Sequence, residues 1–273
     1  MTPDARRVSA EGAQDGYRIR AVVRAAEIMD LLAAADGGAT LNELAAGAEL
    51  PKASAFRMLK TLEEVGFAER VPNSERWRLG VRCLQLGQAY LEQVDLRREA
   101  LPVMEQLRDE LNETVHLAVL NDHLDVVYLE KLESTHAVGI MMSRVGRTAP
   151  AFCTGVGKAL LAVHPGDPVA VLEARGVLKR YTPNTIHDAD ALRADLALTR
   201  ERGFSLDFEE HEPGVRCVAA AFASTAGGPA AAISVSGPAS RMPKGEVQGR
   251  LAQAVVASAR DIGRRMGARE GAA

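Results

Sequence analysis

The sequence predicts an α+β protein with two domains, a small N-terminal one dominated by helices and a larger C-terminal one that mixes strands and helices. The chain has 273 residues, which suggests one large domain or two of roughly 100–200 residues each. Three helices and a two-stranded ribbon come first, and blocks of strands and helices follow. Hydrophobic residues make up 47% and charged residues 25%, so a sizeable core can form and disorder of the whole chain is excluded.

The N-terminal domain is expected to begin with a helix over Tyr17–Ala35, where apolar residues recur at helical spacing. Asp36-Gly37-Gly38 ends this helix, and Thr40 starts a short second one. Thr40 and Glu43 form a T-x-x-E capping box, in which each side chain satisfies a free backbone N–H of the first turn.

A third helix is predicted over Pro51–Val65, because proline suits the first position of a helix and Gly66 suits its end. Two short strands follow at Phe67–Val71 and Arg76–Leu79, with turn residues at Pro72-Asn73-Ser74 between them. Three helices and a two-stranded ribbon within about sixty residues are the outline of a winged helix-turn-helix.

A connecting helix is expected at Val81–Gln93, and the pattern of the chain then changes. The later elements that we expect are a helix at Leu96–Asn112, strands at Val115–Leu120, Val126–Leu132 and Val138–Met142, a loop at Arg144–Thr154, helices at Gly155–Val163, Pro168–Arg175 and Ala189–Arg202, strands at Phe204–Phe208, Val215–Ala223 and Ala230–Ser236, and a helix at Lys244–Met266. Strands and helices run in blocks here, which favours an α+β sheet with helices packed on it.

These elements set the expected domain boundaries. They are a disordered tail at 1–16, a winged helix-turn-helix at 17–80, a linker helix at 81–94, a second domain at 95–266 and a short tail at 267–273. The tail at 1–16 is polar and lacks the apolar stretch of a signal peptide. No later run approaches the roughly 18–20 apolar residues that a membrane span requires, so we expect no membrane partner.

Charge and cysteine usage narrow the class further. The net charge is −3, so any binding to nucleic acid has to come from a local basic patch. The three cysteines are Cys83, Cys153 and Cys217, an odd number without a CxxC pair, which argues against a disulfide scaffold and fits a reducing cytoplasm. No metal-ligand spacing of Cys and His is present. We therefore expect a cytoplasmic protein without a metal or cofactor.

The third helix carries the local basic patch. The apolar side of its helical wheel holds Ala55, Met58, Leu59, Leu62 and Val65, and the opposite side holds Lys52, Ala53, Phe56, Arg57 and Lys60. Its first ten residues contain three cations and no carboxylate, whereas Glu63 and Glu64 come at the far end. This asymmetry suits a helix whose N-terminal half enters the major groove of DNA.

Each side chain on this face has an expected role. Arg57 can donate two parallel hydrogen bonds to a guanine edge, Phe56 can meet a thymine methyl group, and Ser54 can bond a base or phosphate. Lys52 and Lys60 are expected at phosphates, which position the protein without specifying sequence. The ribbon adds Arg70, Arg76 and Arg78 beside the groove. Any single charge is more simply explained as an ordinary solvated residue, but the arrangement as a whole favours DNA binding.

At this point the motifs resemble those of a known family. They are Leu41-Asn-Glu-Leu-Ala, Leu50-Pro-Lys-Ala-Ser-Ala-Phe-Arg-Met-Leu-Lys-Thr-Leu-Glu, Gly66-Phe, Trp77-Arg-Leu-Gly80, Thr154-Gly-Val-Gly-Lys-Ala-Leu-Leu-Ala162, Tyr181-Thr-Pro-Asn-Thr185, Arg200-Glu-Arg-Gly-Phe204, Glu209-Glu-His-Glu-Pro-Gly-Val-Arg-Cys-Val-Ala219 and Ile233-Ser-Val-Ser-Gly-Pro-Ala-Ser-Arg241. Together they resemble IclR-family transcriptional regulators over nearly the whole chain, from about Tyr17 to Met266. Glu49 departs from the family pattern, which has Gly in this turn.

The resemblance implies a dimeric or tetrameric regulator, a repressor or an activator, that binds a palindromic DNA operator. It also implies a GAF-like C-terminal domain that binds a small-molecule effector, often a carboxylate. The effector-binding residues implied by similarity are Ile140, Gly155, Val156, Asp207, Cys217, Ser234 and Ser236. A change in this pocket would then reach the DNA-reading helices through the linker helix.

The residues make such a pocket physically plausible. Gly155 and Gly157 allow close backbone approach at a helix N-terminus, which is a natural carboxylate site. Ser234 and Ser236 are two residues apart and point to one face of a strand. Cys217 is equally well explained as a small buried hydrophobe and as part of the pocket wall.

The sequence also has to be compared with two other classes of protein, an enzyme and a sensor that contacts another protein. An enzyme is disfavoured, because Phe152 and Ala159 stand where a phosphate-binding loop needs Gly and a hydroxyl. Cys217 and His211, as a nucleophile and its base, lack an orienting third residue at a recognisable spacing. The remaining alternative is a ligand sensor whose winged helix contacts another protein, in which case Arg57 and Lys52 would be dispensable.

Overall fold

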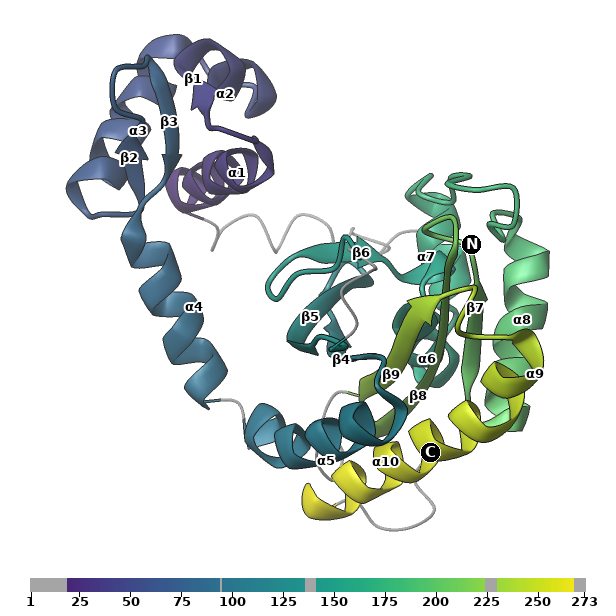
Figure 1. Ribbon diagram of the computed structural model, residues 1–273. Coiled ribbons are helices and arrows are strands. Elements are labelled where there is room, and N and C mark those ends of the chain that lie inside the picture. The colour runs from purple at the N-terminus through teal and green to yellow at the C-terminus, as the bar shows by residue number, and fades with distance from the viewer. Residues whose placement is uncertain (1–18, 94, 136–140, 224–229, 268–273) are drawn as a thin grey trace, which may run out of the picture. The chain divides into compact units, whose positions relative to one another are not determined.

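A computed structural model describes residues 19–93, 95–135, 141–223 and 230–267 (Figure 1). The chain divides into two compact units, one ending at Tyr90 and the other beginning at Leu91. The first unit is a helix-turn-helix domain and the second combines a six-stranded sheet with helices, so the predicted fold class is confirmed. The tail predicted at 1–16 lies outside the described residues, as does nearly all of the tail predicted at 267–273.

The first unit contains the three predicted helices and a small sheet. Its elements are α1 (Arg20–Ala34), β1 (Ala39–Thr40), α2 (Leu41–Gly47), α3 (Lys52–Glu64), β2 (Ala68–Arg70) and β3 (Arg76–Leu79), and α4 (Val81–Gln93) follows them. The three strands pair antiparallel in the order β1-β3-β2. The strand β1 was not predicted, because two residues are too short to show a strand period.

Trp77 on β3 is the centre of this unit, with 1% of its surface exposed. Ile28 of α1, Leu44 of α2 and Leu59 of α3 are buried in the same cluster. Each helix therefore packs one apolar face into the core, and the opposite face of α3 is exposed to solvent.

The turn between α2 and α3 fixes how the two helices meet. The capping box is confirmed, since the Thr40 side chain accepts from the Glu43 N–H and the Glu43 carboxylate accepts from the Thr40 N–H. Glu49 has φ of +52°, a left-handed conformation that costs a non-glycine residue roughly 1 kcal/mol. Two details of the prediction were wrong: Pro51 is the N-cap of α3 rather than its first helical residue, and Val65 is 41% exposed.

The second unit is built on one antiparallel sheet. Its strands are β4 (Thr114–Leu120), β5 (Asp125–Leu132), β6 (Thr148–Pro150), β7 (Ser205–Phe208), β8 (Val215–Ala223) and β9 (Ala230–Pro238), in the order β6-β5-β4-β9-β8-β7. Strand β6 and the 3₁₀ turn after it (Ala151–Cys153) lie inside the predicted loop and were not predicted. The strand predicted at Val138–Met142 lies largely outside the described residues, and Met141 and Met142 are not in a strand.

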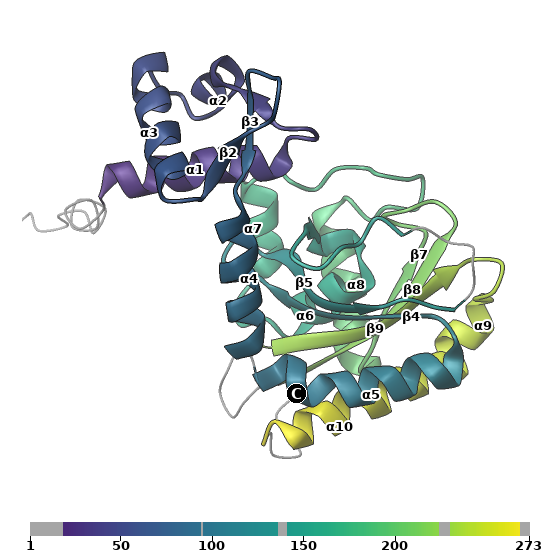
Figure 2. The same ribbon diagram turned by 60° about the vertical axis from the view of Figure 1, so that its left-hand side comes forward.

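Helices cover both faces of this sheet. They are α5 (Asp95–Leu111), α6 (Gly155–Val163), α7 (Pro168–Ala174), α8 (Ala189–Arg202), α9 (Lys244–Glu246) and α10 (Ala252–Arg265), with a π-helical turn at Val247–Leu251 before α10. Figures 1 and 2 show α5 and α10 side by side on one face, and α6 and α8 lie on the other. None of the helices in the described part of the chain has the length and hydrophobicity needed to cross a membrane.

The period of two along each strand decides which side chains reach the functional face. On β4, Val115 and Leu117 point into the core under α5 and α10, whereas Ala118 belongs to the core under α6. His116 therefore points to the α6 side. Ser234 pairs with His116 in register, and Ser236 pairs with Cys217. A row of polar residues thus faces the N-terminus of α6.

Candidate functional site

The first candidate site is the solvent face of α3. Lys52, Ala53, Phe56, Arg57 and Lys60 are exposed, and Ser54 is half-buried. Phe56 keeps 41% of its surface in solvent, which is unusual for a large apolar side chain on a helix and leaves it free to meet an apolar group of a partner. These α3 side chains are therefore accessible to a partner, apart from the half-buried Ser54.

The cations on this face differ in their surroundings. Lys60 pairs with Glu63 one turn further along α3. Within the part of the chain that the structure describes, neither Lys52 nor Arg57 forms an ion pair. These two side chains can reach a phosphate or a base without first breaking a contact.

The three predicted arginines of the ribbon are all engaged within the unit. The Arg70 guanidinium lies 4.5 Å from the centre of the Trp77 ring. Arg76 donates to the Gly38 carbonyl at 2.6 Å, and Arg78 donates to the Glu69 carboxylate at 2.7 Å. Arg76 is half-buried and ties β3 to the turn before β1, so its contact is structural.

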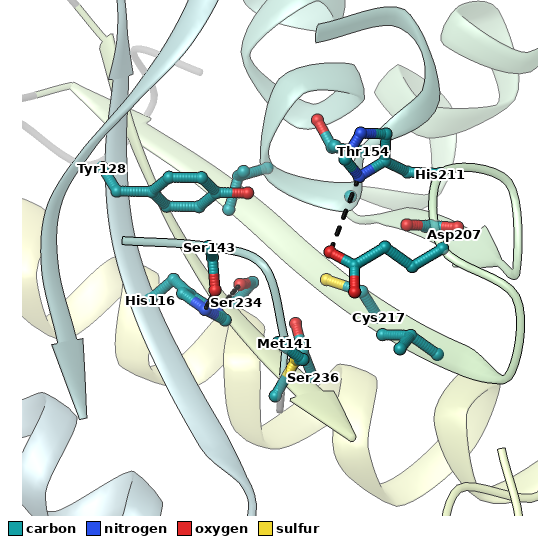
Figure 3. Close-up of a pocket in the computed structure, with 14 residues that line it drawn as sticks. His116, Tyr128, Met141, Ser143, Thr154, Asp207, His211, Cys217, Ser234 and Ser236 are labelled. Carbon is teal, nitrogen blue, oxygen red and sulfur yellow. Dashed lines mark hydrogen bonds and ion pairs between the residues drawn. The ribbon is translucent and has the colours of Figure 1, made fainter. Parts of the chain in front are cut away.

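The second candidate site is a pocket between the N-terminus of α6 and the sheet of the second unit. The space inside it, including the part open to solvent, is about 390 Å³. Figure 3 shows the side chains converging from strands, loops and α6. The residues that line it are His116, Tyr128, Met141, Ser143, Thr154, Gly155, Val156, Asp207, His211, Glu212, Val215, Cys217, Ser234 and Ser236.

Six of the seven residues predicted to bind an effector line this one pocket. They are Gly155, Val156, Asp207, Cys217, Ser234 and Ser236. Ile140 lies outside the described residues, and its neighbour Met141 lines the pocket.

Glycine brings the start of α6 close to the sheet. A Cβ atom added to Gly155 would lie 2.5 Å from the Cys217 sulfur, and one added to Gly157 would lie 2.3 Å from the Ala151 backbone. Thr154 precedes the helix, but its hydroxyl donates to the Pro150 carbonyl at 2.8 Å and does not cap α6. Within the described residues, the first N–H groups of α6 are therefore not capped by the side chain that precedes the helix.

Asp207 is the buried acid of the pocket. Burial and the nearby Glu210 carboxylate raise the pKa of Asp207 to about 7, and its Oδ1 accepts from the Glu210 N–H at 2.8 Å. Near neutral pH this carboxyl group exchanges between its neutral and charged forms. A neutral Asp207 can donate a hydrogen bond to an anionic ligand.

A buried ion pair stands behind Asp207. The Lys158 ammonium group contacts the Glu210 carboxylate at 2.5 Å and the Asp195 carboxylate at 3.0 Å. Burial disfavours the charged form of Lys158, but the two carboxylates outweigh burial and raise its pKa. The turn that carries Glu210 is held by Thr182 and Thr185, whose hydroxyls donate to its backbone carbonyls.

His116 lies on the wall opposite Asp207. Its Nε2 is 2.9 Å from the Ser143 hydroxyl and its Nδ1 is 3.4 Å from the Ser234 hydroxyl. Burial and the charge of Lys131 lower the pKa of His116 to about 3, so the ring is neutral. This residue was not predicted from the sequence, although an imidazole between the apolar residues Val115 and Leu117 of β4 was the available signal.

A short segment, Met141–Arg144, closes one side of the pocket. The Met142 N–H donates to the Glu212 carboxylate at 3.3 Å, and the Lys131 ammonium group donates to the Ser143 carbonyl at 3.2 Å. The Nδ1 atom of His211 and the Oε1 atom of Glu212, which also line the pocket, lie 3.8 Å apart. None of these residues was predicted as an effector contact from the sequence.

Cys217 lines the pocket as a buried, protonated thiol and is not suited to act as a nucleophile. Burial and the nearby Asp207 raise the pKa of its thiol to about 12, and the thiolate is the reactive form. Within the described residues, no three His, Cys, Asp or Glu side chains gather as metal ligands. The geometry supports binding of a small polar molecule.

Comparison with known proteins agrees in both units. Residues 21–72 match the IclR helix-turn-helix domain, and residues 88–264 match the domain described as bacterial transcriptional regulator IclR C-terminal. The chain is 34% identical over 227 residues to the transcriptional repressor IclR of Escherichia coli, covering 82% of each protein. It is 36% identical over 252 residues to the regulator BhcR of Paracoccus denitrificans, covering 92% of this chain and 88% of that one.

Solved structures give the same result. An IclR transcriptional regulator from Alicyclobacillus acidocaldarius superposes with a TM-score of 0.77 at 26% identity, over 92% of this chain and all of that one. An IclR homologue from Microbacterium hydrocarbonoxydans complexed with 4-hydroxybenzoate superposes with a TM-score of 0.68 at 27% identity, over 88% of this chain and 99% of that one.

The relatives are DNA-binding transcriptional regulators and not enzymes, so the enzyme alternative is set aside and the resemblance noted in the sequence is confirmed. The chain belongs to the IclR family of bacterial transcriptional regulators.

Proposed function

We propose that this chain is a cytoplasmic repressor that binds a palindromic DNA operator as a homo-oligomer, and that a small carboxylate bound in the pocket of the second unit modulates operator binding. The proposal rests on one observation above all: the pocket brings uncapped helix N–H groups, a neutralisable acid and serine hydroxyls to one small space. This combination suits an anionic oxygen ligand.

For the DNA interface, the solvent face of α3 supplies the proposed contacts. Arg57 is the proposed reader of a guanine edge and Phe56 of a thymine methyl group. Lys52 and Lys60 are proposed at phosphates, with Ala53 and Ser54 facing the groove beside them. The ribbon arginines Arg70, Arg76 and Arg78 have intramolecular partners, so we assign them a supporting role beside the DNA backbone.

For the effector, the six pocket residues that were predicted from the sequence are the proposed contacts, and Ile140 remains a proposed contact from the sequence alone. The structural relative with bound 4-hydroxybenzoate carries a carboxylate ligand. An anion near Asp207 would favour the neutral form of that residue. We therefore propose that the carboxylate of the effector contacts the first N–H groups of α6, Asp207 and the serines of β9.

A second copy of the chain is the proposed partner of the exposed apolar residues in the first unit. Ile19 and Val22 at the start of α1 are 69% and 63% exposed, and Leu84 and Tyr90 on α4 are 72% and 58% exposed. Exposed apolar surface of this kind marks interaction sites. A two-fold dimer would present two α3 helices to two half-sites of a palindrome.

The test is a gel-shift titration of the full chain against DNA from its own upstream region, at two salt concentrations and with an unrelated duplex as competitor. We expect binding that survives the competitor and weakens steeply with salt, because phosphate contacts release counterions. Small acids, with 4-hydroxybenzoate as the first probe, are then added to the complex. Release or strengthening of the complex by an acid supports the effector part of the proposal.

The same titration tests the alternative of a protein partner. If neither the upstream DNA nor a genome-wide selection yields a preferred sequence, and if Arg57→Ala and Lys52→Ala change nothing, the winged helix serves another partner. Binding that is weak, salt-insensitive or equal for both duplexes contradicts the DNA-binding proposal.

A further inference from the structure

Three polar residues form a row across adjacent strands on the pocket side of the sheet. Lys131 on β5 pairs in register with His116 on β4, and His116 pairs in register with Ser234 on β9. Directly paired residues have side chains on the same face. The row therefore runs from a cation, through a buried imidazole, to a hydroxyl group on the pocket wall.

The imidazole of His116 bridges two serines that both line the pocket. Ser143 lies at Nε2 and Ser234 at Nδ1, at 2.9 and 3.4 Å (Figure 3). His116 has 3% of its surface exposed, so its ring is largely shielded from water. A neutral imidazole carries one N–H donor and one acceptor nitrogen.

The position of that single proton decides what Ser234 offers to the pocket. With the proton on Nδ1, the ring donates to the Ser234 oxygen, and the Ser234 hydroxyl proton can be donated to a bound molecule in competition with the neighbouring Cys217 sulfur, which is a weak acceptor. With the proton on Nε2, Nδ1 accepts the Ser234 proton, and Ser234 presents only lone pairs. The two tautomers thus select opposite ligands, one with an acceptor atom and one with a donor.

Lys131 favours the first arrangement. Its ammonium group pairs with the Glu133 carboxylate at 3.0 Å and donates to the backbone carbonyl of Ser143, the residue whose hydroxyl contacts Nε2. Lys131 is the charge that acts on the pKa of His116, and its contact with Ser143 puts it beside the residue at Nε2. A cation is attracted to a nitrogen lone pair and repelled by an N–H group. The lone pair then belongs on Nε2, where it accepts the Ser143 hydroxyl proton.

We propose that His116 is a positioning residue that makes Ser234 a hydrogen-bond donor, so that the pocket selects a ligand with an acceptor oxygen, such as a carboxylate, at this wall. This inference rests on the proposed function, since it concerns the same pocket. It goes further by naming His116 as the residue that determines, through its hydrogen bond to Ser234, which kind of ligand atom the pocket accepts.

The first test does not depend on a ligand. The full chain is labelled with ¹⁵N-histidine, and the ring signals of His116 are identified among the six histidines as those lost in His116→Gln. We expect a neutral ring with its proton on Nδ1 at neutral pH. A proton on Nε2, or a charged ring, overturns the proposal.

The second test uses two matched variants and 4-hydroxybenzoate, followed by benzoate and acetate, as calorimetric probes. The amide nitrogen of Asn takes the place of Nδ1, so His116→Asn keeps the donor to Ser234 and loses the contact to Ser143. The amide of Gln takes the place of Nε2, so His116→Gln has the opposite effect. We expect acid affinity within about threefold of wild type for Asn and about tenfold or more weaker for Gln.

A purely structural role of His116 predicts equal losses in the two variants, and this result overturns the proposal. Melting temperatures and acid-free DNA binding of both variants show whether they are folded. If wild type binds none of the acids, the effector part of the proposed function fails, and the ring signals then decide the role of His116 by themselves.

Discussion

The solvent face of α3 and the pocket of the second unit are assembled in opposite ways. The α3 face takes its polar groups from a single helix, and its cations Lys52 and Arg57 stand in solvent. The pocket takes its groups from β4, β5, β7, β8, β9, α6 and the loops near them, and most are buried. A change of charge on α3, where binding is proposed to depend on it, is therefore expected to alter stability little. A change of charge in or beside the pocket is expected to alter stability strongly.

The largest effect on stability is expected for the buried cation Lys158, in contrast to the exposed cation Lys52. Lys158→Met leaves the Glu210 and Asp195 carboxylates buried without their cation, which is expected to lower the free energy of unfolding by about 3–5 kcal/mol. The matched control is Lys52→Met on the exposed face of α3, for which a change within about 0.5 kcal/mol is expected. Chemical denaturation of both variants checks this, and similar stabilities would break the comparison.

Asp207 is expected to give the next largest effect, through pH. Its pKa is raised from 3.8 to about 7 in the folded chain, so folding favours the protonated form. The contribution to stability is complete below about pH 4 and is lost as pH rises towards 7. Asp207→Asn keeps the acceptor for the Glu210 N–H and removes the ionisation.

The variant should therefore match wild type near pH 4 and exceed it at pH 7 by on the order of 3 kcal/mol. Denaturant midpoints at a series of pH values measure the difference between the two proteins. A difference that stays constant over this range would mean that Asp207 is not the titrating group.

Gly155 is the position where the close approach of α6 to the sheet can be tested by its effect on stability. Gly155→Ala places a Cβ atom 2.5 Å from the Cys217 sulfur, and overpacking of this kind costs typically 1–3 kcal/mol. Gly249→Ala, in the helical turn before α10, has no atom within 4 Å of the new Cβ and is expected to stabilise by up to about 1 kcal/mol. Opposite shifts in melting temperature are expected, and shifts of the same sign contradict the close approach.

The smallest effects on stability are expected on the α3 face, where the effect is on binding instead. Arg57→Ala should lower affinity for the preferred sequence by about 1–3 kcal/mol and relax its specificity. Lys52→Ala should weaken binding to all sequences and reduce the slope of log affinity against log salt by about 1. Anisotropy titrations against preferred and unrelated duplexes separate the two, and a sequence-independent loss in Arg57→Ala would remove its reading role.

Local patterns were enough to predict the elements that carry both sites. The observed bounds of α4, α6, α8 and β8 are those expected from the sequence, because amphipathic period, capping residues and Gly act over a few neighbouring residues. The short strands β1 and β6 were missed, since two or three residues show no period. Pro51 was predicted as the first residue of α3, and Val65 was predicted on its buried side. Both predictions were wrong at a helix end, where local hydrogen bonds decide which residue is the last one in the helix.

The pocket was predictable only in part. Asp207, Cys217, Ser234 and their partners at the start of α6 were found through the family resemblance. His116 was not found, because its importance comes from its register with Ser234 and Lys131 on neighbouring strands, which a single strand does not reveal. Ser143 and Glu212 reach the pocket from loops that have no sequence period.

The central claim is that one site reads DNA and the other senses a small acid. The most direct test measures DNA affinity by anisotropy for Arg57→Ala and Ser234→Ala, each with and without the acid that acts on wild type. We predict that Arg57→Ala loses affinity for the operator yet still binds the acid, whereas Ser234→Ala binds the operator normally and no longer responds to the acid. A Ser234→Ala variant with an unchanged acid response, or an Arg57→Ala variant with unchanged operator affinity, would contradict this division of roles.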